Sequence, residues 1–67
     1  MINQETKERI ELLIDQAMNT DISKQSCIEL NRIRAKIDGY FYEGCFCSLT
    51  ERYNFINNYI SWFNKNK

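Results

Sequence analysis

The sequence predicts an all-α protein, a small antiparallel three-helix bundle with helices at about residues 3–18, 23–42 and 48–63. The 67 residues include no proline and only two glycines, so few residues interrupt helices. Apolar residues recur at helical spacing in three segments, and the short connections between them favour antiparallel neighbours. The length fits one domain, residues 1–67. Homodimerisation is an alternative way to complete the core, because so short a chain buries only about 60% of its surface on folding.

The first helix is expected from about Asn3 to Met18. Asn3 is a favourable N-cap, and Glu5 and Glu8 lie where the positive end of the helix dipole stabilises acids. The stripe expected to be buried consists of Ile10, Leu13, Ile14, Ala17 and, at its margin, Met18. The polar residues 19–23 then compete with helix through side-chain hydrogen bonds to the backbone and predict a short turn.

The second helix is expected from about Ser23 to Tyr42, capped by Asp21 or Ser23. Gly39 lies inside this pattern and costs up to about 1 kcal/mol relative to alanine, and Gly44 is expected to be the C-terminal cap residue. One face of the helix carries Cys27, Leu30, Ile33, Arg34, Ile37, Tyr40 and Phe41. On the opposite side, Ile28, Ala35 and Tyr42 recur every seven residues.

The third helix is expected from Ser48 to Phe63, and it is the most apolar of the three. Ser48 and Glu51 form a capping-box pattern, which predicts the start of a helix. A first stripe at helical spacing, expected to be core, consists of Leu49, Tyr53, Ile56, Ile60 and Phe63. A second stripe, about a quarter-turn away by the 3.6-residue period, consists of Phe55, Tyr59 and Trp62. Together they make the helix apolar over nearly half its circumference.

Composition and motifs argue against an enzyme. The chain has no histidine, no glycine-rich phosphate loop and no nucleophile motif. Three cysteines, an odd number, fit reduced thiols in the cytoplasm, and Cys45 and Cys47 are expected to be free. Their single-residue separation and the lack of a fourth ligand disfavour zinc, so we expect neither metal nor cofactor. No apolar run is long enough to span a membrane.

The surplus aromatic surface indicates a partner. Tyrosine, tryptophan and phenylalanine are enriched in protein interfaces, and Phe55, Tyr59 and Trp62 follow the spacing of a helix face that binds another protein. These residues and Tyr42 are the expected partner-binding residues, with another protein or a second copy as partner. We expect a small cytoplasmic regulator or inhibitor, and the abundance of Asn, Ile and Lys suggests a phage or mobile element. In the alternative packing, both stripes are core.

A small DNA-binding transcriptional regulator is the alternative function. Asn54, Asn57, Asn58 and Ser61 could contact bases. Nine basic residues balance nine acidic ones, so the chain lacks the positive charge that dominates affinity for nucleic acid. Nucleic acid is therefore the less favoured partner.

Overall fold

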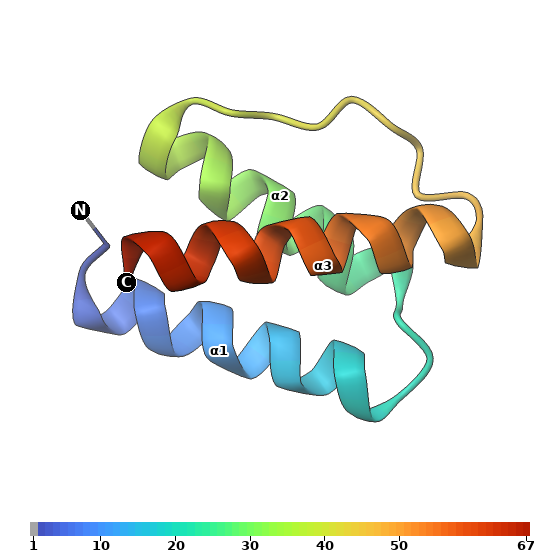
Figure 1. Ribbon diagram of the computed structural model, residues 1–67, viewed down its shortest axis with the longest axis horizontal. Helices are drawn as coiled ribbons and strands as arrows, with labels where there is room; N and C mark the ends of the chain where they lie inside the picture. The colour runs from blue at the N-terminus through green and yellow to red at the C-terminus, as the bar shows by residue number, and fades with distance from the viewer. Residues whose placement is uncertain (1) are drawn as a thin grey trace.

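The computed structural model describes residues 2–67 and contains three helices: α1 (Gln4–Asn19), α2 (Lys24–Asp38) and α3 (Leu49–Asn66) (Figure 1). The part of the chain that is described contains no strand, so the predicted all-α three-helix fold is confirmed. α1 runs antiparallel to both other helices (Figure 1). The predicted antiparallel arrangement of the second and third helices is wrong: α2 and α3 run in the same direction, because the connection between them returns along the length of the molecule (Figure 1).

Each helix begins at a polar cap. The side-chain oxygens of Asn3, Ser23 and Ser48 each accept a hydrogen bond from the backbone N–H three residues later, at 2.8, 3.1 and 3.1 Å. Such a bond satisfies one of the backbone donors that the first turn of a helix leaves without a partner. The predicted caps Asn3 and Ser48 are confirmed, and of the two candidates for α2 the structure uses Ser23.

The predicted extension of the second helix to Tyr42 is wrong, because α2 ends at Asp38. Gly39 follows in the left-handed conformation, with φ +82°, and its N–H donates to the Ala35 carbonyl at 3.0 Å. Glycine adopts this conformation without the steric cost of a Cβ, so Gly39 ends the helix instead of weakening its interior. The C-terminal cap residue is therefore Gly39 and not Gly44.

Residues 39–48, here called the connection, run back along α3 without regular structure (Figure 1). The buried side chain of Asn31 holds the connection through both backbone groups of Tyr42. Its Nδ2 donates to the Tyr42 carbonyl at 2.8 Å, and its Oδ1 accepts from the Tyr42 N–H at 2.9 Å. Phe46, at φ +55°, is 3% exposed and packs into the core. Residues 39–42, expected to continue the second helix, and the short connection expected after them thus form one irregular segment that packs against α3.

A tight packing point explains Gly44. A Cβ at this position would overlap the Glu51 carboxylate and the Tyr42 ring, so any larger residue would force these two side chains to move. On either side of Phe46, Cys45 and Cys47 are joined by a disulfide, so the prediction that both are free is wrong. The local turn at Phe46 brings their Cα atoms to 5.2 Å, inside the range that a disulfide spans.

The core lies where α2 packs against both α1 and α3, and α1 and α3 approach each other less closely. Cys27 is buried there with a free thiol, and burial raises its pKa to about 11, which keeps the thiol protonated. The buried apolar residues are Ile2, Ile10, Leu13, Ala17, Ile22, Cys27, Leu30, Phe46, Phe55, Ile56, Tyr59 and Phe63.

Candidate interaction surface

The four residues expected to bind a partner lie in one aromatic row. Its successive ring centroids are separated by 5.3, 4.8, 5.7 and 5.2 Å, and the order is Tyr42, Phe46, Phe55, Tyr59 and Trp62. Aromatic rings at these separations attract each other beyond the effect of the area they bury. The structure therefore brings the predicted residues together and adds Phe46, which lies in the connection.

This row is part of the core, not an exposed face. Phe55 is 9% exposed and Tyr59 is 1% exposed, whereas Trp62 and Tyr42 are half-buried. The expectation that the second stripe stands free on the surface is therefore not met at Phe55 and Tyr59. The connection is the reason, because Tyr42 and Phe46 both pack their rings against Phe55.

Arg34 covers the other end of the second stripe. Its guanidinium lies 4.2 Å from the centre of the Tyr40 ring and 4.6 Å from that of Trp62. A cation held between two aromatic faces is stabilised by the negative electrostatic potential over those faces. The Arg34 side chain is only 19% exposed, because its guanidinium lies between these two rings.

The first stripe is only partly buried, although the sequence had indicated a core face. Ile56 and Phe63 are buried and Ile60 is half-buried, but Leu49 is 54% exposed and Tyr53 is 51% exposed. Tyr53 and Leu49 lie seven and eleven residues before Ile60, within about 20° of the same line along the helix. This line is the side of α3 next to α1.

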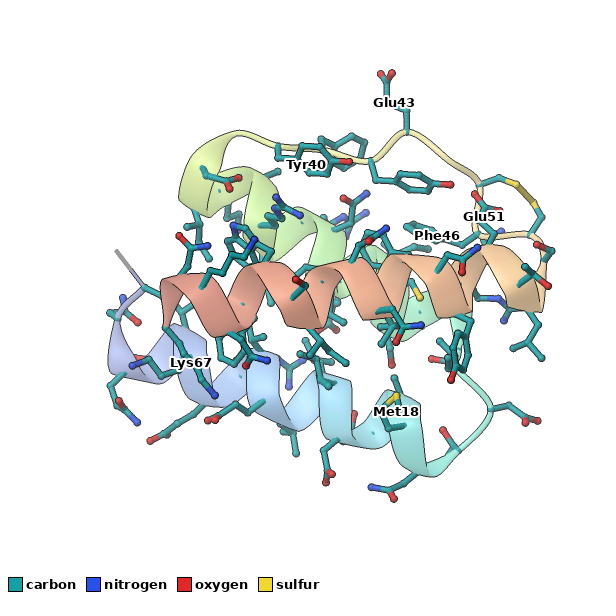
Figure 2. All side chains as sticks on the ribbon, in the orientation of Figure 1. Met18, Tyr40, Glu43, Phe46, Glu51 and Lys67 are labelled. Atoms are coloured by element: carbon teal, nitrogen blue, oxygen red, sulfur yellow. A yellow bond between two sulfur atoms is a disulfide. The ribbon has the colours of Figure 1, made fainter. Side chains whose placement is uncertain are left out.

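A groove of about 260 Å³ lies between α1 and α3. Half-buried Ile14 and exposed Met18 line it from α1, and Ile60 and Phe63 line it from α3. Figure 2 shows Met18 on the side of α1 that faces α3. The four apolar lining residues continue the exposed part of the first stripe, and no segment among residues 2–67 covers the groove; the other four lining residues, Glu11, Asp15, Asn64 and Lys67, are polar or charged.

Acidic residues border this groove on α1. Glu11 and Asp15 line it one turn apart, and Lys67 lies at its far end, with its ammonium group 5.4 Å from the centre of the Phe63 ring. Two acids against one base leave the border net negative. A partner that fits this surface would carry apolar anchors and positive charge.

Glu51 joins the connection to the start of α3. Its carboxylate accepts from the Tyr42 hydroxyl at 2.6 Å and from the Cys47 N–H at 3.1 Å. The pKa of Glu51 lies below its usual value, chiefly because of the hydrogen bond from Tyr42 and to a smaller extent because of the backbone N–H groups. The same bond raises the pKa of Tyr42. Figure 2 shows Glu51 beneath the connection, whereas Glu43 extends into solvent.

Two other surfaces carry exposed apolar residues. Leu12 borders a hollow of about 740 Å³ between α1 and α2, but most of the residues that line it are polar or charged. Tyr40 and Phe41 project from the connection. Of the six large apolar side chains that are exposed within residues 2–67, three (Met18, Leu49 and Tyr53) lie on the α1–α3 side, which makes it the main candidate surface.

Two elements of this arrangement were missed from the sequence, Asn31 and Phe46. Asn31 follows Leu30 directly and lies beside the apolar face of the second helix, a place where a polar side chain must find a partner. Phe46 is a large aromatic between two cysteines, in a segment otherwise typical of a turn. Within the described residues, no three His, Cys, Asp or Glu side chains form a group that could hold a metal ion. None of the three helices is both long and apolar enough to cross a bilayer.

In comparisons with protein-family models, with curated proteins and with solved structures, nothing matched this chain.

Proposed function

We propose that this protein is a small protein–protein interaction module that binds through the α1–α3 side. The observation that carries the proposal is the exposure of Leu49 and Tyr53, at 54% and 51%, beside exposed Met18 and the apolar groove. Exposed apolar side chains that cluster on one face are typical of protein-binding sites. A module of this size would regulate or inhibit a larger protein by occupying one of its surfaces.

The exposure is not a sign of an incomplete fold. The accessible surface is 4536 Å², close to the roughly 4,500 Å² expected for a compact monomer of this mass. The radius of gyration, 11.0 Å, also agrees with about 10.9 Å for a compact chain of 67 residues. A single copy of the chain therefore encloses its core, and the α1–α3 side is available for a further contact.

The partner segment that fits best is an amphipathic helix with basic flanks. A helix of the partner, laid along the groove, would bury its apolar residues against Ile60, Tyr53 and Leu49. These three residues span roughly three turns of α3. Lysine or arginine on its edge would meet Glu11 and Asp15. Burial of the Tyr53 ring would supply a large part of the affinity, since tyrosine is enriched among residues that dominate interfaces.

Site-specific photo-crosslinking tests this surface. A photo-reactive phenylalanine analogue replaces Tyr53 in one variant and Leu12, on the opposite side of α1, in the matched control. We expect a discrete crosslinked product only from position 53, and its loss when Leu49→Ser is added. Equal products from both positions would contradict the proposal.

Salt dependence separates this function from DNA binding. An apolar interface should change little in affinity between 50 and 200 mM salt, concentrations at which a protein that neutralises many phosphates loses several powers of ten, roughly 10³–10⁵. Titration of the purified protein against duplex DNA at both salt concentrations gives the comparison. Tight binding that collapses with salt would favour the regulator of transcription over the interaction module.

A further inference from the structure

The disulfide between Cys45 and Cys47 is accessible, because both cysteines are exposed to solvent. Figure 2 shows the bond at the edge of the molecule, near Glu51. The chain has one further cysteine, Cys27, which is buried with its thiol protonated and therefore reacts slowly. Exchange between thiols and disulfides requires that a thiolate reach a sulfur atom, so soluble thiols act on this chain at the Cys45–Cys47 bond.

The bond spans a single residue, Phe46, whose ring is part of the core. Phe46 is 3% exposed, and its ring centroid lies 4.8 Å from that of Phe55 and 5.3 Å from that of Tyr42. Its backbone has φ +55°, in the left-handed region that residues other than glycine rarely adopt. A cross-link between its two neighbours removes other conformations of this segment. The disulfide and the buried position of Phe46 are therefore coupled, and each favours the other.

Glu51 links the disulfide to the rest of the connection. One carboxylate oxygen, Oε1, accepts from the Cys47 N–H at 3.1 Å and lies 3.8 Å from Cys45 Sγ. The other oxygen, Oε2, accepts from the Tyr42 hydroxyl at 2.6 Å. A rearrangement of the cysteine segment would thus disturb the carboxylate that holds the Tyr42 ring over the second stripe.

We propose that the Cys45–Cys47 bond is a reversible redox site, and that its reduction by a dithiol loosens the connection and uncovers Phe55. A thiolate of the dithiol attacks one cysteine sulfur and forms a mixed disulfide, while the electron pair of the broken bond leaves on the other cysteine, which takes up a proton. The second thiolate of the dithiol then attacks its own partner sulfur and closes the oxidised reagent. The remaining cysteine leaves as a thiolate and is protonated, so two electrons and two protons pass to the protein.

A dithiol suits this site better than a monothiol. After the first step, the released cysteine and the mixed disulfide are two residues apart, so the free cysteine is at high effective concentration and expels a monothiol. The second thiol of a dithiol is also tethered to the mixed disulfide, and it completes the reduction. The site is independent of the surface proposed for protein binding, which lies on the α1 side of α3.

Hydrogen exchange of the full chain, oxidised and then reduced with dithiothreitol, tests the effect of the bond on the connection. The amides of Tyr42 and Cys47, which donate to Asn31 and Glu51, should exchange at least about fivefold faster after reduction, with little change in the middle of α1. Oxidised dithiothreitol should restore the slow rates. The double variant Cys45→Ser with Cys47→Ser should show the fast rates with or without reductant. Unchanged exchange after complete reduction, or a response to reductant in the double variant, would overturn the proposal.

Phe46→Ala tests the same coupling from the side of the core. Since the buried ring favours the disulfide, its loss should shift the equilibrium between disulfide and dithiol by at least about fivefold toward the dithiol, in mixtures of reduced and oxidised dithiothreitol. Alkylation of free thiols followed by mass spectrometry gives the ratio. Phe46→Leu, which keeps an apolar side chain, should shift the equilibrium less, and Tyr53→Ala, in the open part of the first stripe, should leave it unchanged.

The leucine variant also covers the case in which Phe46→Ala does not fold. If folded Phe46→Leu has the same equilibrium as the original protein, the core does not respond to the bond and the proposal is wrong. An equal shift in Tyr53→Ala would likewise contradict it, because that ring makes no contact with the connection in the aromatic row.

Discussion

The two stripes of α3 both consist of apolar and aromatic residues, but they differ in how far they are buried. The second stripe, Phe55, Tyr59 and Trp62, lies under the connection and against Arg34. The first stripe is buried at Ile56 and Phe63 but open at Leu49 and Tyr53. A quarter-turn of one helix thus separates a core from a candidate binding surface.

The difference shows that the connection, and not the helix, decides which stripe is covered. Residues 39–48 supply Tyr42 and Phe46, whose rings complete the core on one side of α3. No corresponding segment among residues 2–67 lies over the α1–α3 side, where the nearest helix keeps more distance. Exposure of an apolar helix face therefore follows from the placement of a segment that has no regular structure of its own.

Phe55→Ala should give the largest effect and is the direct test of the comparison. Deletion of a buried phenylalanine ring costs about 3–5 kcal/mol through lost burial and the cavity left behind. Tyr53→Ala removes a ring of similar size from the open stripe and should cost less than about 1 kcal/mol. The free energies of unfolding in urea give both values.

A domain of this length has only roughly 3–10 kcal/mol of stability in total, so Phe55→Ala could fail to fold. Phe55→Leu then provides a graded version that keeps an apolar side chain. If Tyr53→Ala destabilises the protein as much as either Phe55 variant, the two stripes do not differ and the comparison fails.

Asn31→Ala tests whether the connection must be held in place to cover the second stripe. The change leaves the Tyr42 N–H and carbonyl without the partners they have at 2.9 and 2.8 Å. We expect a loss of about 1–3 kcal/mol in the free energy of unfolding, the usual cost of an unpaired buried group.

Hydrogen exchange sharpens this test, because the Tyr42 amide should exchange much faster in Asn31→Ala while amides in the middle of α1 change little. The control is Asn57→Ala, which alters an exposed asparagine on α3. Unchanged protection of Tyr42 would show that packing of Phe46 alone holds the connection.

Ser48→Ala affects the start of α3, from which both stripes extend. Loss of the bond from the Glu51 N–H to Ser48 Oγ should cost about 1 kcal/mol. For a domain of this size that corresponds to a decrease in melting temperature of roughly 4–8 °C. Ser61→Ala, at an exposed position within the same helix, should cause no decrease. A melting temperature equal to that of the original protein would mean that the cap contributes nothing.

Acid should weaken the link between the connection and α3. The pKa of Glu51 is lowered in the folded protein, chiefly by the Tyr42 hydroxyl, so its contribution is present above the ordinary value of 4.5. That contribution is lost as the pH falls from there through the lower folded-state pKa. Urea unfolding between pH 6 and pH 3 should show a shallower loss of stability for Glu51→Gln than for Glu43→Gln, a change in a solvent-exposed acid. Identical pH profiles would exclude Glu51 as a source of the acid sensitivity.

Local features of the fold were predictable from the sequence. The caps Asn3 and Ser48, the apolar stripe of the first helix around Ile10 and Leu13, and the buried thiol of Cys27 all appear where expected. These features depend on residues within one or two turns of each other, so the pattern itself determines them. The predicted end of the second helix was wrong because a glycine in an apolar helical pattern can lie inside the helix or end it. Only the path of the chain after Gly39 distinguishes these two cases.

The candidate surface was decided by the tertiary structure. A helix that is apolar over half its circumference can bury either edge, and periodicity does not rank the two. The choice depends on the contact between Asn31 and Tyr42, eleven residues apart, and on the positive φ that turns Phe46 into the core. By itself the sequence determined that α3 has more apolar surface than one neighbour can cover. The packing of the connection decided which part stays exposed, because long-range contacts, unlike caps and stripes, have no local pattern.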